Sequence, residues 1–180
     1  MAIAAGERGV YFYQNMQNAQ MPAKQASEAN VVKGHSKQAG YKPQPMVIMG
    51  RQSFTHPAFF EKNNNWRESL YSGNQAQIVV MTISPQTNPT NDVPNEVHDF
   101  DQFILIQSGK AEVYLDDQAL KDVPAGSWLL IPAYTPHYIK NASQTAPLKI
   151  LSIYSKWDTE HPTMTFKTLN DEKKYDESMK

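Results

Sequence analysis

Glu96-Val97-His98-Asp99-Phe100-Asp101-Gln102-Phe103 is the stretch of this 180-residue chain that says most about its fold. On a strand, side chains two residues apart point to the same face, so Glu96, His98 and Gln102 share one side. Asp99 and Asp101 face the other way. A carboxylate, an imidazole and an amide therefore line one wall of the predicted strand.

The residues after this stretch predict a β-hairpin. Residues 103–106, Phe-Ile-Leu-Ile, form a continuous apolar run, and residues 107–110, Gln-Ser-Gly-Lys, are typical of a turn. Residues 111–115, Ala-Glu-Val-Tyr-Leu, would return as the second strand.

A second informative stretch runs from Pro124 to Asn141. Pro124-Ala125-Gly126 suits a tight turn, residues 127–131 resemble a strand, and Pro132 ends it. His137 begins the next predicted strand. If that strand lies beside the first across a barrel, His137 completes the group of polar side chains around Glu96 and His98.

These two stretches resemble the signature motifs of the cupins. The second cupin motif is Gly-x5-Pro-x-Gly-x2-His-x3-Asn, and Gly126, Pro132, His137 and Asn141 match it, with Tyr134 where glycine is usual. The first motif is Gly-x5-His-x-His-x3/4-Glu-x6-Gly. There His98 and Gly109 fit, while Glu96 replaces the first histidine and Gln102 replaces the glutamate.

The chain is more closely similar to a group of small, single-domain bacterial cupins with a Glu-Val-His-x3-Gln-Phe signature, often labelled mannose-6-phosphate isomerase-like. That label rests on fold more than on chemistry, and fold alone does not give function. The likeness covers roughly the last two thirds of the chain and includes Arg67–Tyr71, Ile153–Ser155, His161–Pro162 and Lys167–Thr168.

The resemblance implies an all-β fold, the cupin double-stranded β-helix or jelly-roll barrel. It also implies one divalent metal ion, bound by Glu96, His98, Gln102 and His137. Nitrogen and oxygen ligands of this kind suit zinc, nickel, iron or manganese. Gln102 is the weakest of the four, because an amide is a poor donor and could instead orient a neighbouring ligand. Without the motifs, the same residues would be read as surface or hydrogen-bonded side chains.

Two further residues are candidates for the site. Arg67 precedes an apolar strand and could bind an anionic group of the substrate; the alternative is a structural salt bridge with Glu68 or Glu96. Tyr134, the phenol at the usual glycine position, could narrow the site or relay a proton as a catalytic residue, and the alternative is a surface loop tyrosine.

The chain divides into an N-terminal extension (1–65), a barrel (66–157) and a C-terminal tail (158–180). Residues 14–45 are rich in Gln, Asn, Ala and Lys, which predicts a partly flexible arm or a segment ordered against a partner. The apolar patches 10–13 and 45–49 flank it, and each could supply a strand swapped in a homodimer or a local hydrophobic cover. The charged end, 171–180, is expected to be solvated or briefly helical.

Composition limits the classes of function. With 17 basic and 18 acidic residues and no basic run, the chain is not expected to bind nucleic acid or a membrane surface. It contains no cysteine, which excludes disulfides and thiol nucleophiles and fits a cytoplasmic protein. Neither a signal peptide nor a membrane-spanning stretch is expected.

The leading hypothesis is an enzyme: a metal-assisted isomerase or ring-opening activity on a sugar-like or uronate-like small molecule. Small cupins that open unsaturated uronates also carry Gln at the position of Gln102. One alternative is an iron-dependent dioxygenase. The other is a protein without turnover that binds a metal or a small ligand.

Overall fold

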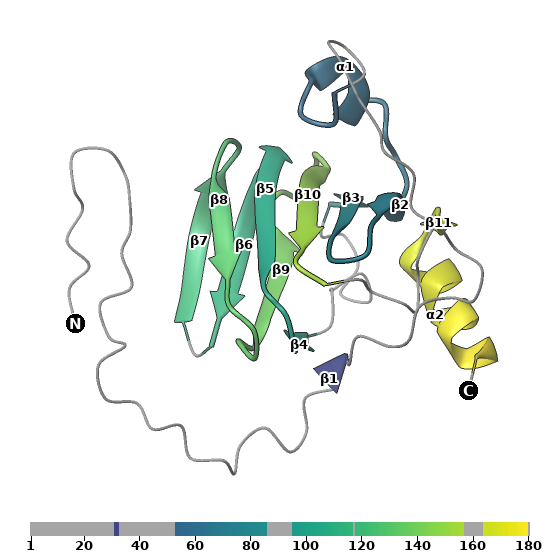
Figure 1. Ribbon diagram of the computed structural model, residues 1–180. Coiled ribbons are helices and arrows are strands. Elements are labelled where there is room, and N and C mark those ends of the chain that lie inside the picture. The colour runs from purple at the N-terminus through teal and green to yellow at the C-terminus, as the bar shows by residue number, and fades with distance from the viewer. Residues whose placement is uncertain (1–30, 33–52, 86–94, 117, 157–163, 180) are drawn as a thin grey trace, which may run out of the picture.

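The computed structural model describes residues 31–32, 53–85, 95–116, 118–156 and 164–179 (Figure 1). Its elements in chain order are β1 (Val31–Val32), α1 (Pro57–Phe60), β2 (Arg67–Ser72), β3 (Gln77–Ile83), β4 (Val97–His98), β5 (Gln102–Ser108), β6 (Lys110–Leu115), β7 (Gln118–Pro124), β8 (Trp128–Ile131), β9 (His137–Asn141), β10 (Leu148–Tyr154), β11 (Thr165–Phe166) and α2 (Leu169–Ser178). Neither helix in these ranges has the length and apolar character that crossing a membrane requires. The patches 10–13 and 45–49, predicted as swapped strands, lie outside the described residues.

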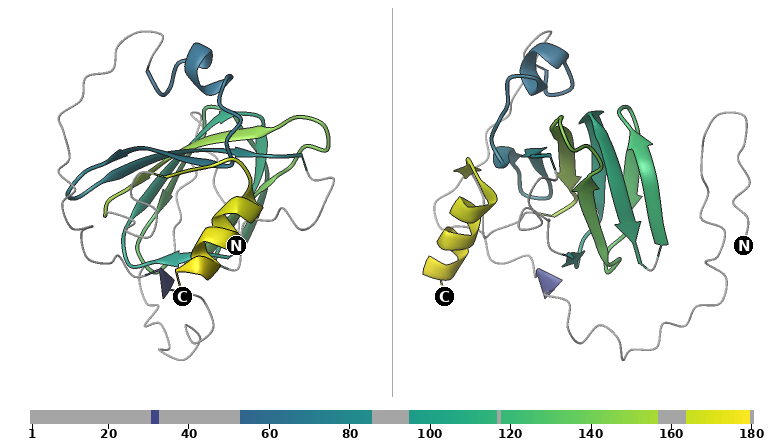
Figure 2. Two further views of the ribbon diagram at one scale, coloured as in Figure 1. Left: turned by 90° about the vertical axis from the view of Figure 1, so that its right-hand side faces the viewer. Right: turned by 180° about the vertical axis from the view of Figure 1, so that it is seen from behind.

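Two sheets form the body of the molecule. One has six strands in the order β11-β2-β3-β10-β5-β8, and the other has three in the order β7-β6-β9. Seen from the side in the left panel of Figure 2, they curve around a shared interior. All pairings within these two sheets are antiparallel. The predicted all-β barrel is confirmed.

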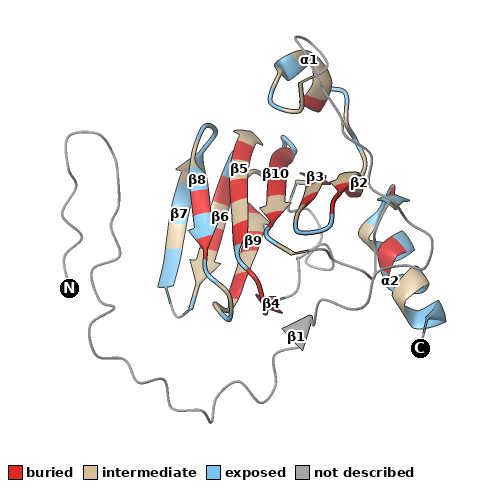
Figure 3. Ribbon diagram, in the orientation of Figure 1, coloured by how far each residue is buried: buried red, intermediate tan, exposed pale blue. Residues whose placement is uncertain are grey.

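The core lies between the two sheets, and strands β5, β8 and β9 alternate buried and more exposed residues, whereas β3 and β10 are buried along most of their length. Along β5 and β9 every second side chain is buried (Figure 3). Val79 and Ile104 from the larger sheet and Val113 and Ile139 from the smaller one belong to a single apolar cluster. Burial of such a cluster is the main term that stabilises a barrel of this size.

The predicted hairpin between residues 103–106 and 111–115 is wrong. Strand β6 pairs with β7 and β9, whereas β5 pairs with β10 and β8, so the chain passes from one sheet to the other at Gly109. Gly109 has φ +86°, and a Cβ there would lie 2.8 Å from the carbonyl oxygen of Pro147. A glycine permits both the left-handed backbone and the close approach that this crossing needs.

The described part of the C-terminal tail extends the larger sheet. Strand β11 pairs with β2, placing Phe166 opposite Arg67, and α2 follows directly. Thr168 and Asp171 form a capping box at the start of α2. The helix is polar, yet it is not simply solvated, because Glu172 is buried. This part of the chain therefore lies against the barrel, beside the edge formed by β11 (Figure 1).

Candidate metal centre

The backbone brings the two informative stretches together at one point. Glu96 and His137 form an antiparallel bridge in which each N–H donates to the other residue's carbonyl oxygen over 2.9 Å. His98 follows in β4, and its carbonyl oxygen accepts a bond of 2.7 Å from the N–H of Tyr134. The segment carrying Glu96 and His98 thus lies beside the strand that begins at His137, which is the condition that the sequence left open.

A bend separates His98 from Gln102, where the sequence suggested a continuous strand. Asp101 holds the bend: its Oδ1 accepts from the Ala133 N–H over 2.9 Å, and its carbonyl oxygen accepts from the Ser155 N–H over 2.9 Å. Asp99 binds Lys156 at 2.7 Å. Both aspartates therefore have partners in the surrounding structure, while Gln102 starts β5 on the interior face.

Three potential metal ligands converge in this centre. One donor atom from each of Glu96, His98 and His137 lies within 4.8 Å of the others. Nε2 of His98 is 3.2 Å from Oε2 of Glu96, and the two imidazole centroids are 5.2 Å apart. Both histidines are buried, and Glu96 is partly buried. Two imidazoles and a carboxylate at this spacing suit a divalent transition-metal ion.

The histidine rings are oriented by their neighbours. Nδ1 of His137 lies 2.8 Å from the carbonyl oxygen of Thr135, so Nδ1 carries the proton and the lone pair of Nε2 faces inward. His98 stacks on Phe100 with centroids 4.8 Å apart and meets the edge of Tyr154 at 5.6 Å. A fixed tautomer and a packed ring are what a ligand needs before the metal arrives.

Unsatisfied atoms show that the residues fit a bound ion. The buried side-chain atoms without a hydrogen-bond partner include Nε2 of His98, Nε2 of His137 and Oε1 of Gln102. Buried polar atoms in native proteins nearly always have a partner, so such a cluster calls for an explanation. A metal ion among them would supply the missing partner for all three.

The pKa shifts in the centre favour the protonation states in which His137 and Glu96 can bind a metal ion. Burial lowers the pKa of His137, more than the Thr135 carbonyl and the Glu96 carboxylate raise it. Burial also opposes ionisation of Glu96, but the hydrogen-bonding contact with His98 and the positive charge of Arg67 are among the interactions that hold the pKa of the carboxyl below its ordinary value. A neutral His137 and an ionised Glu96 are the states that bind a cation.

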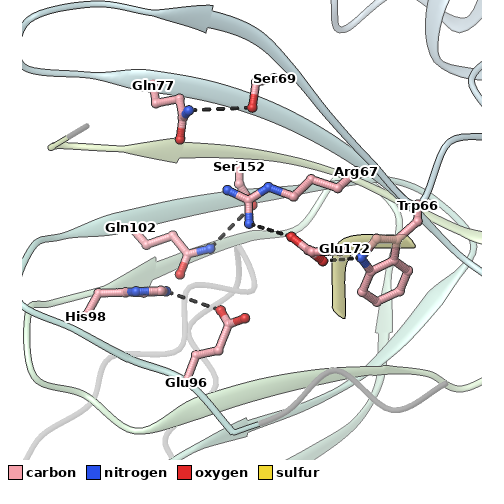
Figure 4. A network of polar contacts seen from close by, with 9 residues as sticks. All are labelled: Trp66, Arg67, Ser69, Gln77, Glu96, His98, Gln102, Ser152 and Glu172. Carbon is pink, nitrogen blue, oxygen red and sulfur yellow. Dashed lines mark hydrogen bonds and ion pairs between the residues drawn. The ribbon is translucent and has the colours of Figure 1, made fainter. Parts of the chain in front are cut away.

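Gln102 lies at the same centre. It is buried, its Nε2 donates to Oγ of Ser152 over 3.4 Å, and Figure 4 shows its amide oxygen turned toward the His98 imidazole and the Glu96 carboxylate. The bond to Ser152 on β10 holds the amide nitrogen away from the centre. This leaves the oxygen as the atom that faces a bound ion.

Arg67 is near the centre and belongs to a buried ion pair. Among the residues that the structure describes, it forms an ion pair with Glu172 of α2, with Nη1 3.2 Å from Oε1, rather than with the expected Glu68 or Glu96. The other carboxylate oxygen of Glu172 accepts from Nε1 of Trp66 over 2.6 Å. Sequence reasoning missed Trp66, Ser152 and Glu172. Only the position of Trp66 next to Arg67 offered a signal, since Ser152 and Glu172 are separated in sequence from every predicted site residue.

Tyr134 lies at the surface beside the centre. Its side chain is 60% exposed, and its φ of +64° is the left-handed conformation that explains why glycine is usual at this position. Its backbone N–H, rather than its phenol, makes the bond to His98. A proton-relay role for the phenol stays a prediction.

Comparison with known proteins agrees with this geometry. Residues 79–154 match the family model described as a cupin domain. The barrel therefore has the cupin fold. The structure of this chain is similar to the crystal structure of BH2720 from Bacillus halodurans, with a TM-score of 0.61 and 24% identity over 77% of this chain and 99% of that one. A likeness at that identity concerns the fold.

Two curated relatives share sequence with the cupin domain. YrkC of Bacillus subtilis is 28% identical over 123 residues, covering 64% of this chain and 59% of the relative. L612 of Acanthamoeba polyphaga mimivirus is 36% identical over 104 residues, covering 56% of this chain and 61% of the relative. Both are described as uncharacterized, and the chain spans about three fifths of the length of each.

Proposed function

We propose that this cupin is a metal-dependent enzyme that isomerises or ring-opens a small sugar-like or uronate-like molecule. The observation that carries the proposal is that Glu96, His98 and His137 each place a donor atom within 4.8 Å of the others. Nε2 of both histidines and Oε1 of Gln102 are also buried without a hydrogen bond. A structural role would have left these atoms paired within the protein. A metal centre with one anionic ligand explains them.

The residues of the centre have complementary roles in this proposal. Glu96, His98 and His137 would hold a divalent ion and Gln102 would turn its amide oxygen to it. A divalent ion bound there supplies Lewis acidity, which polarises carbonyl and hydroxyl oxygens of a substrate. Arg67, whose positive charge already stabilises ionised Glu96, would bind an anionic substrate group. Tyr134 would relay a proton at the mouth of the centre.

The ligand set also favours a second candidate, an iron-dependent dioxygenase. Two histidines and one carboxylate with open coordination positions are typical of non-haem iron oxygenases. The two proposals differ in the metal they require. Zinc, nickel or manganese supports the isomerase, whereas iron together with oxygen consumption supports the dioxygenase.

Elemental analysis of untagged protein, purified without added metal or chelator, tests the proposal. The variant His137→Ala should lose a metal that the wild-type protein carries at about one ion per chain. His56→Asn is the matched control, because His56 accepts a bond from the Ala58 N–H as the N-cap of α1, and asparagine also serves as an N-cap. Wild-type protein that neither carries nor takes up metal would favour a ligand-binding barrel without turnover.

We also propose that the protein is a cytoplasmic homodimer that binds a small molecule and has no nucleic-acid or membrane partner. The balanced charge of the sequence supports the absence of such partners, and its lack of cysteine fits the cytoplasm. The identity of the substrate is likewise a proposal.

A further inference from the structure

The C-terminal helix is docked through a carboxylate. In α2 the buried residue is Glu172, which accepts from Nε1 of Trp66 over 2.6 Å and from Nη1 of Arg67 over 3.2 Å. Tyr175 adds a ring contact to Phe166 of β11, with centroids 5.6 Å apart. Leu169 and Tyr175 also pack against the apolar core, so the helix is anchored by two partly buried apolar side chains and by a buried ion pair.

Stability alone is a poor explanation for this ion pair. Both side chains are 11% exposed, so each charge has lost most of its water. The cost of removing two charges from water often exceeds their mutual attraction, and apolar residues of similar size commonly stabilise a protein as well or better. A buried pair beside a predicted metal centre therefore points to a use for the charge of Arg67.

The guanidinium of Arg67 lies close to the candidate metal centre. In Figure 4 its guanidinium projects between the Glu172 carboxylate and the pair formed by Gln102 and Ser152, above Glu96 and His98. A guanidinium has five donors in one plane and serves more than one acceptor at a time, with a geometry that matches carboxylates. Glu172 and Trp66 fix one side of this group in space.

We infer that Glu172 is a positioning residue, which holds the Arg67 guanidinium where it binds the carboxylate of a ligand at the metal centre. The inference rests on the proposed function and narrows its substrate class to small carboxylates with a neighbouring hydroxyl or carbonyl oxygen. A divalent ion with Glu96 carries about one net positive charge, and the Arg67–Glu172 pair is neutral. One ligand carboxylate would therefore neutralise the centre.

Cobalt-loaded protein provides the test, because the visible absorption of Co²⁺ changes when a ligand binds. The probes are glycolate, which has a carboxylate next to a hydroxyl, and ethylene glycol, which has a similar size without the charge. The wild-type protein should bind glycolate and not ethylene glycol. Arg67→Met should weaken glycolate binding by about tenfold or more without lowering the cobalt content, as expected for loss of a charge-assisted hydrogen bond.

Glu172→Gln tests whether Glu172 positions Arg67 without disturbing the fold, because the glutamine oxygen can still accept the hydrogen bond from Trp66. It should weaken glycolate binding by about threefold to tenfold, and it should have no further effect in the Arg67→Met background, since it acts through Arg67. Glu177→Gln, an exposed change in the same helix, is the control and should bind glycolate as the wild type does.

Each outcome decides a different point. Equal glycolate affinity in wild type and Arg67→Met, or equal binding of glycolate and ethylene glycol, overturns the inference and leaves the metal centre intact. A Glu172→Gln effect that persists at full size without Arg67 shows that Glu172 is not a positioning residue for Arg67. A wild-type protein that takes up no cobalt overturns the proposed function and the inference with it.

Discussion

Glu96 and His137 exchange two backbone hydrogen bonds, each 2.9 Å long, so the backbone joins the two halves of the candidate metal centre. One donor atom from each of Glu96, His98 and His137 consequently lies within 4.8 Å of the others. Ligands held in place by the fold lose little conformational freedom on binding, which favours high affinity.

Replacement of single ligands should rank their importance. We expect His98→Ala to abolish stoichiometric metal binding, because the remaining donors are too few for a stable site. Gln102→Ala should cause a smaller loss, since an amide oxygen is a weak donor. Metal content by elemental analysis after dialysis checks both. Full metal content in His98→Ala would exclude the assigned site, and equal losses would make Gln102 a direct ligand.

Acid should destabilise the metal-free protein through His137. Burial lowers the pKa of this imidazole below 6.5 in the folded chain, so the unfolded chain takes up the proton first as the pH falls. The free energy of unfolding is therefore highest above about pH 6.5 and decreases below it, toward the folded pKa. The pKa of Glu96 is also lowered in the folded chain, so protonation of Glu96 decreases the free energy of unfolding further at lower pH.

Thermal melts of the chelator-treated protein between about pH 8 and pH 5 measure this dependence. The His137→Gln variant should show a shallower fall in melting temperature than the wild type between about pH 6.5 and pH 5, because one titrating group is gone. An unchanged slope would show that other groups dominate the acid response.

Two glycines allow a matched test of the crossing between the sheets. Gly109 and Gly126 have φ of +86° and +87°, but a Cβ at Gly109 meets the Pro147 carbonyl at 2.8 Å, while one at Gly126 meets nothing within 4 Å. Gly126→Ala should cost roughly 1 kcal/mol for the left-handed backbone alone. Gly109→Ala should cost clearly more. Urea unfolding measures the loss of unfolding free energy in both variants. Equal losses would show that the segment around Pro147 shifts to make room for the added Cβ.

The predicted homodimer has a candidate surface on the larger sheet. Trp128 and Leu130 of edge strand β8 are 51% and 65% exposed, and their partners in β5, Leu105 and Phe103, are partly buried beside them. Adjacent exposed apolar side chains of this kind often mark an interface between proteins. Trp128→Lys should shift a dimer toward monomer in light scattering coupled to gel filtration. Lys140→Glu, on the other sheet, is the control and should not.

The sequence predicted the metal centre better than the path of the chain around it. Alternation along a strand predicted that Glu96 and His98 share a face, and the resemblance to the cupin motifs added His137, which the structure brings within 4.8 Å of the other two. The hairpin at Gly109 failed, since a turn signal does not tell which sheet the next strand will join. Glu172 could not be predicted from the sequence for a related reason. It contacts Trp66 and Arg67, which are more than 100 residues away in the chain, and it lies among other charged residues in the sequence.

The separation of Glu172 from the metal ligands has a consequence for how such a protein can change over evolution. The ligands lie on strands that also build the core, so most substitutions near them would disturb folding. Helix α2 contributes one buried carboxylate, packs Leu169 and Tyr175 against the core, and is otherwise mostly exposed. Changes in this helix can therefore alter which ligands the centre accepts while the barrel and its metal remain as they are.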